Sequence, residues 1–262
     1  MATTMFGVYA AGLTATLASP ALTSLELAWL IQNSQPNLIV TAAATLGAVY
    51  AALKQVTTEQ AVPSSYKVKI YVLDLDSAIT SSQPDAQDWK QLLLPKPLQK
   101  PVSFSQQEYR TRTAVILWSS GTTGRSKGVL LSHHALTTSV TSLWHVFPTW
   151  NGEEKFLGIA PFYHVFGLVC VLLLAPGAGS TLYVMEKFDF PTMLAYIEKY
   201  RISFLHIAPP IAVHLSNNPA VNGVDLSSVK GIMSGGAPLP PAIVDRVYER
   251  LGLCIALVSN VA

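Results

Sequence analysis

The sequence has few charged residues and no basic run. Asp, Glu, Lys and Arg make up only 12% of its 262 residues, against 50% hydrophobic residues, and the 17 basic and 15 acidic side chains leave a formal net charge of +2. Nucleic acids and anionic membranes attract proteins through dense positive charge, which this composition does not supply. We therefore expect no nucleic-acid partner and no electrostatic membrane patch.

Cysteine is equally scarce. The two cysteines, Cys170 and Cys254, lie far apart in the sequence, and neither belongs to a CxxC or Cys/His pattern. A disulfide framework and a zinc site both need more cysteines or closer spacing, so neither is expected. The cysteine content fits a reducing, intracellular compartment.

The N-terminal segment has almost no charge. Glu26 is the first Asp, Glu, Lys or Arg, and the next is Lys54. A secretory signal would begin with a basic region, and the interruptions at Gly7, Gly12 and Pro20 argue against a membrane span, so neither is expected. The segment is predicted to be an internal packed element. A second interpretation is that it packs against chain that is not present.

Apolar segments of strand length alternate with segments of helix length along the rest of the chain. The expected strands are Leu38–Thr41, Lys67–Leu73, Ala114–Trp118, Phe156–Ala160, Ser180–Met185, Ser203–Ile207 and Val229–Met233. The expected helices are Thr23–Asn33, Ser132–Phe147, Leu168–Leu174, Phe190–Arg201, Pro210–Ser216 and Pro240–Leu251. A polar connector is expected at about residues 80–105. This alternation predicts the α/β class, with largely parallel sheets flanked by helices.

One loop is rich in hydroxyl groups and glycine. The segment "WSSGTTGRSKGV", Trp118 to Val129, follows an expected strand, and ligands of parallel sheets bind at such carboxyl ends. Its glycines let backbone amides converge on an anion, and its hydroxyls and lysine add donors, which predicts a phosphate site. The GxxxxGK[ST] pattern fails at Ser126 and the GxGxxG pattern fails at Thr123. The alternative is an ordinary flexible loop.

The same residues resemble a known family. "SSGTTGRSKGV" is similar to the signature loop SSGTTGxPKG of the adenylate-forming (AMP-binding) superfamily, except that Ser126 replaces the proline. "APFYHVFGL", Ala160 to Leu168, and "SGGAPLP", Ser234 to Pro240, resemble two further motifs of that superfamily in the same order. The resemblance implies a partial N-terminal domain of the adenylate-forming fold over residues 1–262. It favours the acyl-CoA synthetase branch that is similar to 4-coumarate-CoA ligases.

The resemblance also implies a reaction and its participants. An ATP-dependent acid-CoA ligase joins a small carboxylic acid to the α-phosphate of ATP and then transfers the acyl group to coenzyme A. Mg²⁺ would reach the site on the phosphates, with no protein ligand assigned to it. Lys127 would steady the departing pyrophosphate, and His164 would orient the carboxylate. The expected nucleotide contacts are Ser119, Ser120, Gly121, Thr122, Thr123, Gly124, Lys127, Gly128, Gly235, Gly236, Ala237 and Pro238.

Simpler interpretations of these residues stay open. His164 lies in an apolar run and could be a core histidine. The two glycines at Gly235 and Gly236 could form only a strand-to-helix turn. His133 and His134 begin the helix after the phosphate loop; they could extend its positive edge, but a solvated helix N-terminus is the expected role. His145, His206 and His214 show no ligand spacing and are assigned no chemistry.

The family's YGxTE motif and its C-terminal domain with a catalytic lysine do not occur in this sequence. One hypothesis is that the sequence is part of an active ligase with a longer chain. The alternative is a truncated, catalytically inactive remnant that binds a nucleotide or an acyl ligand. The resemblance implies the cytoplasm or the peroxisome, and it leaves the acid and the oligomeric state open.

Overall fold

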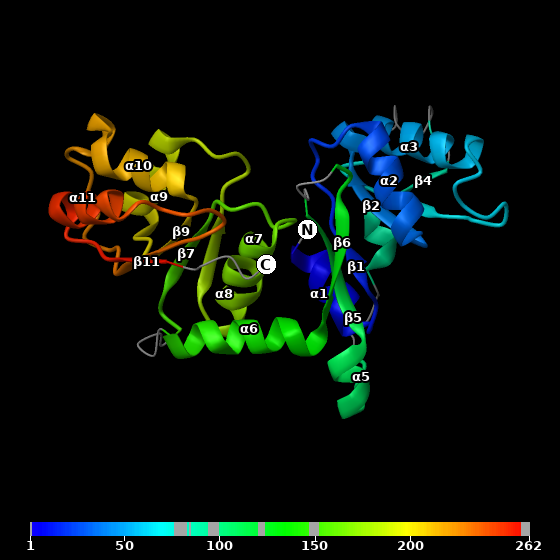
Figure 1. Ribbon diagram of the computed structural model, residues 1–262, viewed down its shortest axis with the longest axis horizontal. Coiled ribbons are helices and arrows are strands. Elements are labelled where there is room, and N and C mark those ends of the chain that lie inside the picture. Colours follow the sequence, from blue (N-terminus) through cyan, green and yellow to red (C-terminus); the bar gives the residue numbers. More distant parts are fainter. Residues whose placement is uncertain are drawn as a thin grey trace. The chain divides into compact units, whose positions relative to one another are not determined.

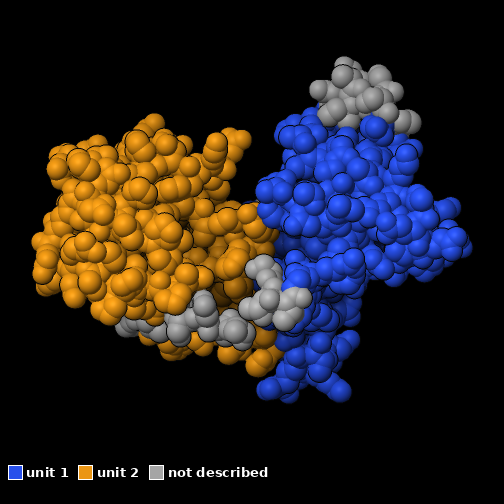
Figure 2. Space-filling model, turned by 45° about the horizontal axis from the view of Figure 1, so that its top comes forward, with its two compact units in different colours: residues 1–133 blue, residues 134–262 orange. Residues whose placement is uncertain are grey.

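The computed structural model describes residues 2–75, 83, 85–93, 100–119, 124–146 and 152–257. The chain divides into two compact units, residues 1–133 and residues 134–262 (Figures 1 and 2). Each unit contains parallel strands together with helices, so the predicted α/β class is confirmed.

The first unit contains a parallel sheet with a helix pair packed on it. Its strands, in spatial order, are β2 (Leu38–Ala42), β3 (Lys69–Leu73) and β4 (Ala86–Asp88). The helical segments between β1 and β3 are α2 (Ser24–Ser34), η1 (Ala43–Thr45) and α3 (Leu46–Thr58). Helix α2 begins where Thr23 and Glu26 form a capping box, and buried Ala28 and Ile31 pack against α3. Leu46 and Val49 of α3 then pack on β3, so the two helices and the sheet share one core.

A second sheet in the first unit carries the phosphate-loop segment. Its strands, in spatial order, are β1 (Ala15–Thr16), β5 (Thr113–Ser119) and β6 (Lys127–Ser132). β1 runs parallel to β5, whereas β6 pairs with β5 in the antiparallel direction. Helix α1 (Ala2–Ala10) precedes β1, and helix α5 (Gln106–Thr111) precedes β5. The indole of Trp118 donates a 2.9 Å hydrogen bond to Thr16, which ties β5 to β1.

The second unit is built on a parallel sheet of five strands. In spatial order they are β11 (Ile255–Leu257), β10 (Gly231–Ser234), β9 (Phe204–Ile207), β7 (Lys155–Gly158) and β8 (Thr181–Val184). The helical segments are α6 (His133–Val146), α7 (Val165–Gly167), η3 (Leu168–Leu173), α8 (Leu174–Gly177), α9 (Phe190–Tyr200), α10 (Pro209–Asn217), η4 (Pro219–Val221) and α11 (Pro241–Leu251).

Helices cover both faces of this sheet (Figure 1). Strand β9 shows the alternation: Leu205 and Ile207 point into a core shared with α9, α10 and α11. Phe204 points the other way, into a core that it shares with Leu174 of α8. All four residues of β9 are therefore buried, as expected for a central parallel strand.

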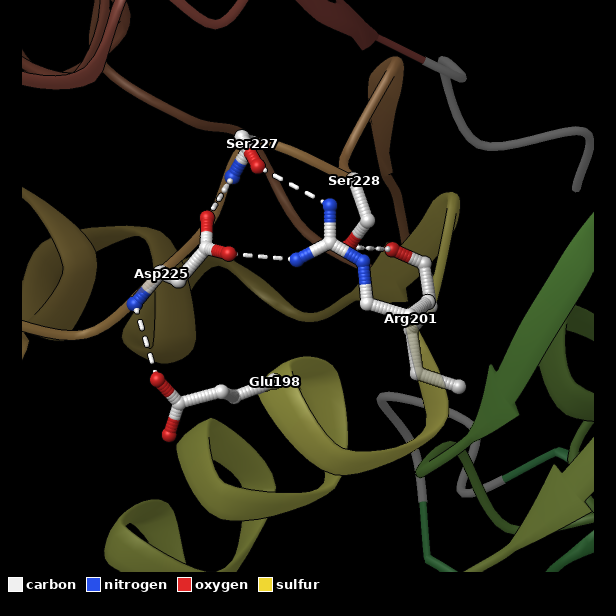
Figure 3. A network of polar contacts seen from close by, with 6 residues as sticks. Glu198, Arg201, Asp225, Ser227 and Ser228 are labelled. Carbon is white, nitrogen blue, oxygen red and sulfur yellow. Dashed lines mark hydrogen bonds and ion pairs between the residues drawn. The ribbon is translucent and has the colours of Figure 1, made fainter.

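A polar network fixes the chain before β10 (Figure 3). Arg201 ends α9 in the left-handed conformation, and its guanidinium donates hydrogen bonds to Asp225 and to Ser227. Ser228 donates a 2.8 Å hydrogen bond to the carbonyl of Ile202. Hydrogen bonds from Ser227, and then the Arg201 guanidinium, lower the pKa of Asp225 to about 2. The network anchors the segment that leads into β10 and the turn after it.

Three differences from the sequence predictions concern the sheets and the helical run after His164. Residues 127–132 form the strand β6. We did not predict this strand, because its sequence shows no alternation of polar and apolar residues and its Val129 and Leu130 are exposed. The predicted polar connector contains β4, whose three residues are too few to give a periodic pattern. The predicted helix Leu168–Leu174 is the middle of a longer helical run through α7, η3 and α8, with η3 in the π conformation.

The N-terminal segment forms α1, in which Met5 is the buried residue. Within the described residues, no helix combines the length and the apolar character needed to cross a membrane.

Candidate functional site

The described ends of the hydroxyl-rich loop are the two strands of a hairpin. Ser119 is the last residue of β5, Lys127 is the first of β6, and the two are paired in register. Both side chains are exposed. Four of the predicted site residues between them lie outside the described residues; they are Ser120, Gly121, Thr122 and Thr123.

The structure explains why glycine occurs at two positions of this loop, with a different reason for each. Gly124 has a φ of 124°, a conformation that residues with a side chain rarely adopt, and among the described residues no atom lies within 4 Å of where its Cβ would stand. A Cβ at position 128 would stand 3.4 Å from the indole of Trp118 and 3.2 Å from Ile116, so Gly128 lies close against these two side chains. Gly124 therefore adopts a backbone conformation that favours glycine, and Gly128 lets β6 approach β5 closely.

Residues 124–126, which we call the second limb of the loop, also contact helix α2. The sequence did not indicate this contact. The indole Nε1 of Trp29 donates a 2.8 Å hydrogen bond to the backbone carbonyl of Ser126. The guanidinium carbon of Arg125 lies 4.6 Å from the centroid of the Trp29 ring. A lone tryptophan on a helix far away in the sequence carries no pattern that would reveal such contacts.

His164 begins the helical run of the second unit. Its Nδ1 accepts a hydrogen bond of 3.3 Å from the backbone N–H of Phe166, so it caps α7. With Nδ1 as the acceptor, a neutral ring carries its proton on Nε2. The side chain is exposed, which excludes the alternative of a core histidine. Nε2 is thus left as a donor on an oriented ring.

The turn after β10 contacts the segment that follows His164. Gly235 is buried, and a Cβ there would stand 2.7 Å from the ring of Phe166. The backbone N–H of Gly235 donates a 3.2 Å hydrogen bond to the carbonyl of Ile207. Gly236, with a φ of 86°, then turns the chain outward, and the exposed residues of the turn are Gly236, Ala237 and Pro238. The structure thus brings the second and third motifs together within the second unit.

This arrangement offers two kinds of chemistry. The hairpin of the first unit presents a lysine, a hydroxyl and a glycine turn, which suit an anion. The second unit presents an exposed turn with few side-chain atoms, next to Phe166, and the imidazole of His164 lies two residues before Phe166 in the chain. The described residues contain no group of three or more His, Cys, Asp or Glu side chains that could hold a metal ion.

The comparisons with known proteins show the family of the chain. A family model described as AMP-binding enzyme matches residues 1–261. The chain is 30% identical over 245 residues to the peroxisomal OPC-8:0-CoA ligase 1 of Arabidopsis thaliana, covering 93% of this chain and 42% of that one. It is also 30% identical over 251 residues to the 4-coumarate–CoA ligase 3 of the same plant, covering 92% of this chain and 40% of that one.

Solved structures share the fold. A red-emitting luciferase from Phrixothrix hirtus matches with a TM-score of 0.76 and 26% identity, covering 95% of this chain and 46% of that chain. The ATP-bound MatB from Rhodopseudomonas palustris matches with a TM-score of 0.77 and 20% identity, covering 99% of this chain and 47% of that chain. The chain therefore spans less than half the length of these relatives.

Proposed function

Because the chain belongs to the family of AMP-binding enzymes, we propose that it supplies the nucleotide- and acid-binding residues of an ATP-dependent acid-CoA ligase. The observation that carries the proposal is the hairpin in which exposed Lys127 pairs with Ser119 around the signature loop. A reaction between two anions, a carboxylate and ATP, needs the phosphate charge to be neutralised, and a lysine with hydroxyl and amide donors supplies this.

Each group of residues has a proposed role. The hairpin loop binds the β- and γ-phosphates, and Lys127 stabilises the negative charge of the pyrophosphate as it leaves. His164 donates a hydrogen bond from Nε2 to the carboxylate, an orientation that the bond from Phe166 to its Nδ1 fixes. The exposed turn at residues 236–238 offers a flat base a surface without bulky side chains.

The proposed substrates are a small carboxylic acid, ATP and coenzyme A. The signature loop and the names of the ligases that the chain resembles support them. Magnesium would accompany ATP, because its charge neutralises phosphate oxygens, and we assign it no ligand among the described residues. A peroxisomal or cytoplasmic location is the corresponding proposal, supported by the peroxisomal relative.

Lys127→Met tests the proposal. Losing a charge-assisted hydrogen bond to phosphate costs about 1.5–3 kcal/mol, so we expect the affinity for Mg-ATP to fall by roughly tenfold or more. Equilibrium dialysis of the 262-residue chain with radiolabelled Mg-ATP measures this. Lys54→Met, which removes another exposed lysine of the same unit, is the matched control and should bind like the wild type. Equal binding by all three proteins would refute the role of Lys127, and no saturable binding at all would refute nucleotide binding itself.

A further inference from the structure

Trp29 joins helix α2 to the second limb of the loop at two points. Its indole N–H donates to the carbonyl of Ser126, and its ring faces the guanidinium of Arg125. These two residues directly precede Lys127 in the chain. A contact that fixes the positions of Arg125 and Ser126 therefore also fixes the start of β6 and the backbone of Lys127.

Helix α2 is a suitable anchor for this contact. The capping box of Thr23 and Glu26 satisfies two backbone donors at its N-terminus, and Ala28, Leu30 and Ile31 on either side of the tryptophan are buried. The side-chain amide of Asn33 donates a 2.7 Å hydrogen bond to the Trp29 carbonyl. The backbone of Trp29 is therefore held by the core of the unit, while its half-buried ring reaches the loop.

Within the described part of the chain, residues 124–126 make few other polar contacts. Gly124 and Arg125 are exposed, and glycine gives the turn wide conformational freedom. Position 126 is a serine, whereas a proline there would fix φ by its ring. An external hydrogen bond and a cation–π contact are the kinds of interaction that can replace that restriction.

We propose that Trp29 is a positioning residue, which holds Ser126 and Arg125 so that Lys127 is placed to bind polyphosphate. The proposal depends on the proposed function of the loop as the phosphate site. Its contribution is to affinity for the phosphate chain, because Trp29 orders the limb before the ligand arrives and so lowers the entropy that binding must remove.

Three substitutions separate the two contacts. Trp29→Phe keeps an aromatic face for Arg125 but removes the N–H donor, Arg125→Gln removes the cation and leaves the donor, and Trp29→Ala removes both. The net value of one hydrogen bond or one exposed cation–π pair corresponds to a few-fold change in a binding constant. We expect magnesium pyrophosphate to bind about fivefold more weakly to each single-contact variant and about twentyfold more weakly to Trp29→Ala.

The readout is chosen so that a general loss of stability cannot imitate the result. Affinities for magnesium pyrophosphate and for AMP are measured by calorimetry on the 262-residue chain, with Trp144→Phe as a control tryptophan on α6. AMP lacks the β- and γ-phosphates, so its affinity should be unchanged in every variant, while that for pyrophosphate falls. In ¹⁵N spectra of the wild type, the Trp29 indole N–H resonance should shift when pyrophosphate is added.

The outcomes test this proposal separately from the proposed function of the loop as the phosphate site. If the wild type binds pyrophosphate and Trp29→Phe, Arg125→Gln and Trp29→Ala all bind it equally tightly, the positioning role is wrong and the phosphate site stands. If pyrophosphate and AMP weaken together, Trp29 is a structural residue only, which also overturns the proposal. If the wild type does not bind pyrophosphate, both the site and the role of Trp29 are wrong.

Discussion

Gly167→Ala is expected to destabilise the second unit by roughly 4 kcal/mol or more, a magnitude that single substitutions reach only through a severe steric or electrostatic conflict. A Cβ on Gly167 would stand 2.2 Å from the carbonyl oxygen of Pro161 and 2.8 Å from that of Ala160. Both obstacles are backbone atoms, so no side chain can rotate out of the way. The tight turn between β7 and α7, on which the position of His164 depends, would have to open.

Gly177→Ala provides the matched control in the same helical run. A Cβ at Gly177 would meet Val140 at 3.5 Å, an ordinary van der Waals distance. Alanine is also the better helix former, by about 1 kcal/mol, so this variant should be as stable as the wild type or slightly more so. Urea unfolding followed by circular dichroism compares the three proteins. A Gly167→Ala protein within about 1 kcal/mol of the wild type would show that the turn does not have the geometry described.

Between pH 7 and pH 4.5 the wild type is expected to lose about 2 kcal/mol of its free energy of unfolding. We expect His206→Leu to abolish most of this loss. His206 is fully buried on β9, with the ring of Phe156 at 4.8 Å and that of Phe204 at 6.0 Å. Neither of its ring nitrogens has a hydrogen-bond partner within the described part of the chain. Burial lowers its pKa from 6.5 to about 3, because the charged form cannot be solvated there.

The direction of the pH effect follows from these two values. Between pH 6.5 and pH 3 the unfolded chain takes up a proton that the folded chain excludes, so the free energy of unfolding falls as the pH falls through this window. Carboxylates whose pKa is lowered, such as Asp189 and Asp225, add an acid-dependent loss that the wild type and His206→Leu share. His145→Gln, which changes an exposed histidine, should keep the wild-type profile. Parallel profiles for the wild type and His206→Leu would contradict the buried, neutral state of His206.

Elements with a strong local pattern could be predicted from the sequence. Helix α2 has a capping box at Thr23 and Glu26, and β9 is apolar except for His206. Both elements were predicted to within a few residues. Strand β6 was missed because its pairing with β5 is set by the hairpin, while its own Val129 and Leu130 are 45% and 63% exposed. Strand β4 depends on its pairing with β3, which no local pattern in three residues can specify.

The candidate site shows the same division between local pattern and tertiary contact. The glycines and hydroxyls of the signature loop, together with the order of the three motifs, are local features, and they were sufficient to identify the family. The contact of Phe166 with Gly235 and the two contacts of Trp29 with the loop join residues far apart in the sequence. A single sequence gives no sign of such pairs, because they depend on how the elements pack.

The central claim is that the loop between β5 and β6 binds a polyphosphate. Titrating the ¹⁵N-labelled chain with Mg-ATP, and following the backbone amide resonances, tests it directly. Saturable shifts should be largest at Ser119, Gly124 and Lys127 and should disappear in Lys127→Met. Shifts that are confined to other parts of the chain, or that are the same in Lys127→Met, would contradict the account.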